Sequence, residues 1–173
     1  MHNLLLLRIH FISFEKNIVL KEIKITKGQI LQRKGDLNSK VYQVRSGLLR
    51  SYSIDEKGKE HIYMFAPENW IIADGVNPKK PNELFIDALE DSVIIQREKD
   101  LSAVSQTEKL INRLEVLQQR IILLMSASAI ERYENFIKTY PEIVQRVPQK
   151  MIASYLGITP EALSNAKRHR LKK

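Results

Sequence analysis

Glycine and proline divide the chain into two parts with different predicted structures. Five of the six glycines lie between Gly28 and Gly75, whereas residues 99–140 contain neither glycine nor proline. Both residue types punctuate turns and are disfavoured inside helices. Their distribution therefore predicts short strands joined by turns in the first part of the chain and long helices in the second.

Short apolar runs separated by turn residues extend from about Val19 to Gln96. The turns are predicted at Lys27-Gly28, Lys34-Gly35-Asp36, Ser46-Gly47 and Asp55-Glu56-Lys57-Gly58. Turn signals at this regular spacing favour an antiparallel sandwich or barrel. Residues 74–82 are rich in Gly, Pro, Asn and Lys, and they are predicted to form a loop before the last strands.

Apolar residues in the second part recur with the period of a helix. One seam alternates steps of four and three residues through Leu110, Leu114, Leu117, Ile121 and Leu124. Such a seam either pairs with a second copy of the chain or packs an amphipathic helix on its own domain. The hydroxyls of Ser126 and Ser128 favour a break, and a second helix is predicted from about Ala127 to Thr139, just before Pro141.

Positive charge is concentrated toward the carboxy-terminal end. The formal net charge is +8, and residues 126–173 supply +5 of it, with nine Lys and Arg against four Asp and Glu. A local basic excess indicates a polyanionic partner, such as nucleic acid or an anionic membrane surface. A solvated basic tail is the alternative.

Cysteine is absent, which excludes disulfides, thiolate metal sites and cysteine nucleophiles. The apolar run Leu4–Leu7 is interrupted by Arg8 and His10, and no stretch approaches the roughly 20 apolar residues of a membrane helix. We therefore expect a cytoplasmic protein without a membrane partner. A lone histidine on a strand, such as His10 or His61, is more often structural than a haem ligand, so no cofactor or metal is expected.

Residues 149–165 have the features that a helix-turn-helix requires. Ala153 is small enough for two helices to cross closely, and Gly157 permits the positive φ of a sharp bend. The run Thr159-Pro160-Glu161 supplies an N-cap, a proline at the first helical position and a carboxylate that complements the helix dipole. The shared core is predicted to consist of Ile152, Leu156, Ile158 and Leu163. An ordinary helical hairpin with a basic end is the alternative.

The second helix of this motif is predicted to enter the major groove of DNA, with basic residues near the phosphates. The residues predicted to contact DNA are Gln149, Lys150, Thr159, Glu161, Ser164, Asn165, Lys167, Arg168 and Arg170.

The chain from about Ile23 to Arg170 resembles the Crp/Fnr family of regulators. The resemblance rests on the order of the turn residues, on the run from Ala88 to Ser92 and on the run from Ala153 to Glu161. Pro148-Gln149-Lys150 and Arg132-Tyr133 are similar to a short-tailed branch. It implies an α+β chain with an antiparallel β-roll of the jelly-roll type, related to cyclic-nucleotide-binding domains. The implied boundaries are 1–106 for the roll, 107–125 for a dimerisation helix and 126–173 for the helix-turn-helix domain.

The resemblance also implies a homodimer that binds a two-fold-related site on double-stranded DNA, with RNA polymerase as a further partner. The alternative is a roll that senses a small molecule and whose basic tail docks a protein rather than DNA. An enzyme is not expected, because the sequence has no Ser, His and Asp pairing, no His-Glu-x-x-His motif and no phosphate-cradling glycine loop.

The predicted sensor loop departs from the nucleotide-binding members of this family. Those members carry a glutamate for the ribose and an arginine for the cyclic phosphate, and the corresponding places here fall on Asp74 and on Asn82-Glu83. A phosphate would lose its bidentate cation and meet a carboxylate instead. Asp74, Gly75, Asn82 and Glu83 are therefore predicted to line an effector pocket that does not take cyclic AMP, and its effector is unknown.

The predicted DNA-binding end departs from the family in two ways. Relatives usually carry arginine where this chain has Asn165, and asparagine suits adenine rather than guanine, so we expect a shifted base preference. The sequence ends at Lys173. We therefore expect a helix-turn-helix without the β-wing of many members, with the basic tail supplying phosphate contacts.

Overall fold

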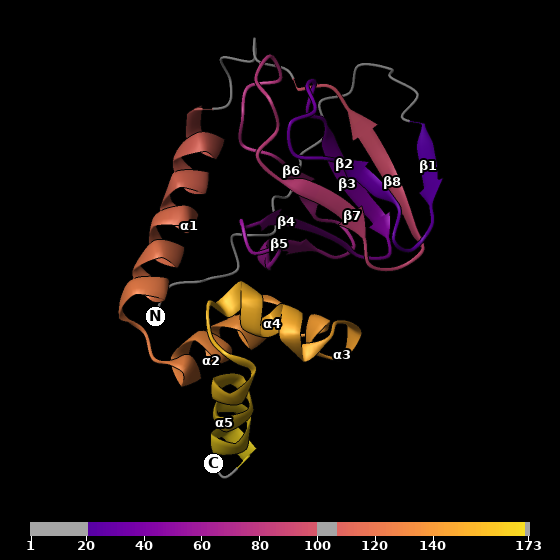
Figure 1. Ribbon diagram of the computed structural model, residues 1–173. Coiled ribbons are helices and arrows are strands. Elements are labelled where there is room, and N and C mark those ends of the chain that lie inside the picture. Colours follow the sequence, from indigo (N-terminus) through magenta and orange to yellow (C-terminus); the bar gives the residue numbers. More distant parts are fainter. Residues whose placement is uncertain (1–20, 100–106, 172–173) are drawn as a thin grey trace. The chain divides into compact units, whose positions relative to one another are not determined.

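The computed structural model describes residues 21–99 and 107–171 (Figure 1). The described residues fall into two compact units, one formed by residues 21–99 and the other by residues 107–171. The first unit contains only strands and the second only helices. The change in structure predicted from glycine and proline is thereby confirmed, and so is the α+β class.

The first unit is built from two four-stranded sheets. Their strands are β1 (Glu22–Ile25), β2 (Ile30–Gln32), β3 (Val41–Ser46), β4 (Leu49–Ile54), β5 (Glu60–Ala66), β6 (Ile71–Ala73), β7 (Phe85–Ala88) and β8 (Ser92–Arg97). One sheet has the order β1-β8-β3-β6 and the other the order β2-β7-β4-β5. All neighbouring strands are antiparallel. Because the chain crosses repeatedly from one sheet to the other, the two sheets form a roll, as predicted.

The core of the roll lies between the two sheets. Alternation along β3 buries Tyr42 and Val44, while Gln43 between them is only partly buried. The core cluster also includes Leu49, Ala66, Ile72, Ile86 and Ile94. Full burial of an aliphatic side chain stabilises the fold by about 1.5–3 kcal/mol relative to its exposure. This core is therefore the main source of stability for the loops that the roll carries.

Gly47 shows why one of the predicted turns requires glycine. Its φ is 91°, and a Cβ at this position would lie 2.6 Å from the carbonyl oxygen of Asp91. Real Cβ contacts are longer than this, so any other residue would push apart the turn between β3 and β4 and the turn before β8. The strand β6, which follows Trp70, is a difference from the sequence expectation, because no strand is predicted there.

The second unit contains five helices. They are α1 (Thr107–Ser126), α2 (Ala129–Thr139), α3 (Ile143–Arg146), α4 (Gln149–Leu156) and α5 (Pro160–Leu171). The predicted break after α1 is confirmed, and Ser128 forms a capping box with Glu131. The second helix therefore begins at Ala129 rather than at Ala127. The single turn α3 falls where no helix is predicted. Within the two described segments, no helix is both long and apolar enough to span a membrane.

Candidate nucleic-acid interface and sensor loop

The helices α4 and α5 meet at the bend predicted from Gly157. This glycine has φ 63° and ψ 35°, in the left-handed region, and it ends α4. The amide of Ile158 donates to the Ala153 carbonyl at 3.0 Å, which closes the bend. Ala153 is 2% exposed. A larger side chain at this position has no space, so the small residue and the bend glycine act as the sequence predicts.

The start of α5 is fixed by its own capping groups. The Thr159 hydroxyl oxygen accepts a hydrogen bond from the Ala162 amide at 3.2 Å, and the helix begins at Pro160. The pKa of Glu161 is lowered by a hydrogen bond from its own backbone amide and by one from Thr159. Thr159 and Glu161 therefore serve to begin the helix as well as lying on its exposed surface.

The exposed face of α5 is narrow and polar. Leu163 and Ala166 are buried, at 0% and 1% exposure, and they fix which side of the helix faces the core. The opposite side presents a stripe of exposed residues at helical spacing. This reading stripe consists of Glu161, Ser164, Asn165 and Arg168.

Asn165 and Arg168 form a pair within the reading stripe. The Asn165 side-chain oxygen accepts a hydrogen bond from Nη2 of Arg168. Bidentate recognition of adenine uses both the oxygen and the nitrogen of an asparagine amide. An adenine contact by Asn165 therefore competes with Arg168 for the amide oxygen, which sequence reasoning on Asn165 alone does not reveal.

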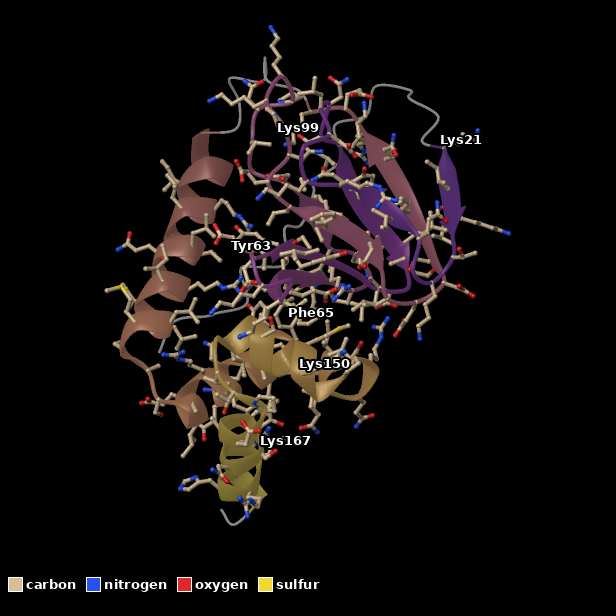
Figure 2. All side chains as sticks on the ribbon, viewed as in Figure 1. Lys21, Tyr63, Phe65, Lys99, Lys150 and Lys167 are labelled. Carbon is tan, nitrogen blue, oxygen red and sulfur yellow. The ribbon has the colours of Figure 1, made fainter. Side chains whose placement is uncertain are left out.

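The predicted phosphate-contacting residues surround the reading stripe. Lys150 is on α4 and Lys167 is on α5, as labelled in Figure 2. Gln149, Lys150 and Arg170 are exposed, whereas Lys167 is half-buried. The structure thus brings all of the residues predicted to contact DNA onto α4, α5 and the bend between them.

The residues of the predicted dimer seam do not share one environment. Leu114 and Ile121 are 65% and 57% exposed. Leu117 and Leu124 are half-buried, and the side chain of Leu110 lies outside the described residues. Among the side chains described from residue 111 to the end of α1, the most exposed apolar ones are Ile111, Leu114, Ile121, Ile122 and Met125. This exposed apolar face shares Leu114 and Ile121 with the predicted seam but is rotated around the helix away from Leu117 and Leu124.

The predicted effector loop is organised around the carboxylate of Asp74, which follows β6. Its Oδ2 accepts hydrogen bonds from the amides of Glu83 and Leu84, both at 2.8 Å. Oδ1 accepts from the Val76 amide at 3.2 Å, and Gln32 Nε2 lies 3.3 Å from Oδ2. Asp74 is 4% exposed. The loop therefore directs its backbone donors at an anion that belongs to the protein itself.

Two further contacts close this loop. The Lys99 ammonium, labelled in Figure 2, donates to the carbonyls of Asp74 and Val76 at 2.6 and 2.7 Å. Burial lowers the pKa of Lys99, and the Asp74 carboxylate opposes that shift. Asn82 is buried, and its backbone amide donates a hydrogen bond to the Asp36 carbonyl at 2.8 Å. Gly75 and Glu83, also predicted in the pocket, are exposed. No sequence pattern singles out Lys99, because its two partners are backbone carbonyls.

Of the two histidines predicted to be structural, His61 lies within the described residues. It pairs with Asp55 across the β4–β5 hairpin. Its Nε2 lies 2.8 Å from Oδ2 of Asp55. The Asp55 carboxylate also accepts hydrogen bonds from the amides of Lys57 and Lys59. The pKa of Asp55 is lowered first by the hydrogen bond with His61 and then by those from the Lys59 and Lys57 amides. This arrangement fits the structural role. His10 lies outside the described residues.

Comparison with known proteins places this geometry among bacterial regulators. The chain is 31% identical over 169 residues to the fumarate and nitrate reduction regulatory protein of Yersinia pestis, covering 86% of this chain and 68% of that protein. It is 27% identical over 174 residues to the anaerobic regulatory protein of Haemophilus influenzae, covering 86% of this chain and 66% of that protein. No family model matches the chain.

Two solved structures of regulators share the fold of this chain. FixK2 from Bradyrhizobium japonicum superposes with a TM-score of 0.72 at 21% identity, over 88% of this chain and 84% of that chain. A transcriptional regulator of the CRP/FNR family from Thermus thermophilus superposes with a TM-score of 0.61 at 13% identity, over 88% and 86%. The chain spans about two thirds of the length of the curated relatives it matches, from 62% to 73%.

Proposed function

The chain belongs to the Crp/Fnr family of transcriptional regulators, and from this premise we propose that it is a homodimer that binds specific sites on double-stranded DNA through α4 and α5. The observation that carries the proposal is the reading stripe of α5. Four polar side chains at helical spacing lie opposite a buried apolar side, on a helix whose first turn is capped. An exposed recognition helix of this kind suits the major groove.

The charge around the stripe supports the same proposal. Lys150 and Arg170 are exposed on the two helices that meet at the bend, and the segment 126–173 supplies most of the net positive charge. Phosphate contacts made by such residues fix the position of a protein on the duplex, whereas base contacts select the sequence. The carboxylate of Glu161 is the single acidic group of the stripe, and carboxylates accept hydrogen bonds from cytosine.

The exposed apolar face of α1 supports the homodimer. Met125 is 81% exposed and Leu114 is 65% exposed, although both are large apolar side chains on a regular helix. Apolar side chains repeating along one side of a helix are typical of helix pairing. A second copy of α1 is the occupant we propose, because a two-fold DNA site requires two reading helices in a fixed relation.

Binding to DNA is expected to be sequence-specific and strongly dependent on salt. Selection from random duplexes should recover a two-fold site with half-sites roughly 34 Å apart. The logarithm of the binding constant should fall linearly with that of the salt concentration, and Lys150→Ala or Arg170→Ala should each reduce the slope by about 0.9 because one phosphate contact is lost. Fluorescence anisotropy with a labelled duplex measures the binding constant at each salt concentration, and the slope follows from these values.

A matched control for these variants is Lys57→Ala, which removes an exposed lysine from the β4–β5 hairpin. Its salt slope and selected sequence should equal those of the wild type. Asn165→Arg should change the base selected at one position of each half-site, because it replaces the amide and its bond to Arg168. If the wild type binds the selected duplex no better than random DNA, the proposed function is wrong.

The sensor loop is proposed not to respond to cyclic AMP. A cyclic phosphate held by this loop would need the amide donors that the Asp74 carboxylate already occupies. It would also bring a second negative charge beside a buried carboxylate, and uncompensated buried charge is costly. We propose that the loop is held closed by Asp74 and Lys99 rather than by a nucleotide. The identity of any effector is not assigned.

Replacement of Asp74 by alanine is expected to destabilise the roll by about 3 kcal/mol, because it leaves buried backbone donors without an acceptor. Cyclic AMP at millimolar concentration should leave the melting temperature of the wild type unchanged. Urea unfolding followed by Trp70 fluorescence measures the first quantity, because Trp70 is the single tryptophan and belongs to the roll.

Asp36→Ala is the control, because Asp36 is exposed and its carboxylate accepts one hydrogen bond, from the Arg33 amide at 3.2 Å. It should cost about 1 kcal/mol or less. A stabilising shift with cyclic AMP in the wild type would contradict the closed loop.

The proposal assigns no catalytic step to the protein. A regulator that binds chromosomal DNA works in the cytoplasm of a bacterial cell, and RNA polymerase is its expected further partner. The boundaries 1–106, 107–125 and 126–173 are the proposed limits of roll, dimerisation helix and helix-turn-helix domain.

A further inference from the structure

Arg132 binds the ends of two different helices. It lies near the start of α2, and its side chain is half-buried. Nη2 donates to the Leu124 carbonyl at 2.7 Å, and Nη1 donates to the Leu156 carbonyl at 3.1 Å. Nε donates to the carbonyl of Ala127 at 3.0 Å. A single guanidinium thus connects the last turn of α1, the link that follows it and the last residue of α4.

The carbonyls of Leu124 and Leu156, at the ends of α1 and α4, need donors from elsewhere. The last four carbonyls of an α-helix have no partner within the helix, and they carry the negative end of the helix dipole. Within the described helices, neither α1 nor α4 has a basic residue in its last turn. Arg132 therefore supplies one cation to both helix ends, and the planar fork of arginine lets it hold several acceptors at fixed angles.

A second contact joins the same two helices. The guanidinium carbon of Arg120, on α1, lies 4.2 Å from the ring centroid of Tyr155, on α4. Gly157, at the bend of the helix-turn-helix, follows Tyr155 by two residues and lies close to the side chain of Arg132. A Cβ placed on Gly157 would lie 3.7 Å from Nη1 of Arg132 and 3.8 Å from Cδ2 of Leu124.

The covalent link between α1 and α2 is short but does not fix their angle. Ala127 and Ser128 are the only residues between the two helices. Ser128 caps α2, and so it determines how α2 begins rather than how α1 is directed. The helices α2, α4 and α5 share a core that includes Phe136, Ile152 and Leu163. Arg132 is not one of the buried residues of this core.

We infer that Arg132 is a positioning residue that sets the direction of the helix-turn-helix relative to α1. This inference rests on the proposed function, in which α1 joins two copies and α5 reads DNA. The separation of the two reading helices then depends on the angle at residues 127 and 128. Arg132 holds that angle by binding the end of α1 and the end of α4 at the same time.

The first test measures the angle without DNA. Because the chain has no cysteine, spin labels can be attached at Asn112→Cys on α1 and His169→Cys on α5, both exposed, with labelled protein diluted in unlabelled protein. The wild type is expected to give a narrow distance distribution. Arg132→Met should broaden or shift it, and Arg132→Lys should give an intermediate width, because one ammonium cannot reach all three carbonyls.

The second test measures the consequence on DNA. With palindromes whose half-sites are moved apart or together by single base pairs, the wild type should prefer one spacing. Arg132→Met should lower the affinity for that spacing by about tenfold and make the affinity less dependent on spacing. When the angle between α1 and α2 varies, the second α5 helix of the dimer is less often in position to bind its half-site, so its effective concentration falls. Its affinity for a single half-site should be unchanged.

Lys138→Met, an exposed change at the end of α2, is the control and should match the wild type in both tests. If Arg132→Met does not fold, Arg132→Lys carries the comparison. A distance distribution with both the mean and the width of the wild type in the folded Arg132 variants would overturn the inference, whatever the DNA results. Absence of specific DNA binding by the wild type would overturn the proposed function but leave the spin-label test intact.

Discussion

The double replacement of Leu114 and Ile121 by glutamate is expected to convert the dimer into a monomer and to lower the affinity for a two-fold DNA site by about a hundredfold. Both side chains lie on the exposed apolar face of α1, at 65% and 57% exposure. Four carboxylates would then face one another across the two-fold axis, where they lose water and repel. Sedimentation equilibrium measures the mass, and anisotropy with the selected duplex measures the affinity.

The matched control adds the same charge to another side of the same helix. Asn112→Glu and Gln119→Glu are exposed positions about a third of a turn from the apolar face, and the pair should leave mass and affinity close to those of the wild type. A double variant of Leu114 and Ile121 that sediments as a dimer would show that another surface joins the copies. A wild type that is monomeric at every concentration would contradict the homodimer itself.

Phe136→Ala is expected to lower the free energy of unfolding of the helical unit by about 3–5 kcal/mol. The Phe136 ring is 1% exposed. It packs at centroid distances of 5.3 Å from Tyr140 and 5.4 Å from Tyr155. Removing it leaves a cavity beside the rings of Tyr140, which follows α2, and Tyr155, which is on α4. A domain has only about 5–15 kcal/mol of stability, so DNA binding should be lost on modest heating.

Urea unfolding followed by far-ultraviolet circular dichroism measures this loss, because all of the described helices belong to one unit. Trp70 fluorescence reports on the roll and should change much less. Phe136→Leu is the control, which keeps most of the apolar volume and should cost about 1 kcal/mol. Equal shifts of both signals would contradict the assignment of Phe136 to the stability of the helical unit alone.

The features predictable from the sequence are those whose cause is local. The bend at Gly157 requires a residue that tolerates positive φ, and the start of α5 requires an N-cap. Each feature can therefore be predicted from a single residue type. The turn at Gly47 is visible for the same reason. The strand β6 and the turn α3 contain three and four residues, and neither is long enough to show a period.

The features that escaped prediction depend on contacts between distant segments. Periodicity shows that α1 has an apolar side, but only the folded chain shows that Leu124 lies beside Gly157 while Met125 is exposed. The bonds of Arg132 and Lys99 end on backbone carbonyls, which carry no sequence signal. The Asp74 carboxylate is visible in the sequence as a departure from a phosphate site. Its partners, the amides of residues 83 and 84, become evident only when the loop is closed.

The capped start of α5 also determines what DNA recognition costs this protein. Thr159 and Pro160 hold the first turn in helical form, and Leu163 and Ala166 anchor the helix on its own core. A basic segment that folds only on DNA loses its conformational entropy at the moment of binding and gives up affinity in doing so. Here that entropy is lost when the chain folds. In the proposed function the reading stripe therefore meets DNA as a preformed surface, and its contacts would contribute to affinity without an ordering penalty of the backbone.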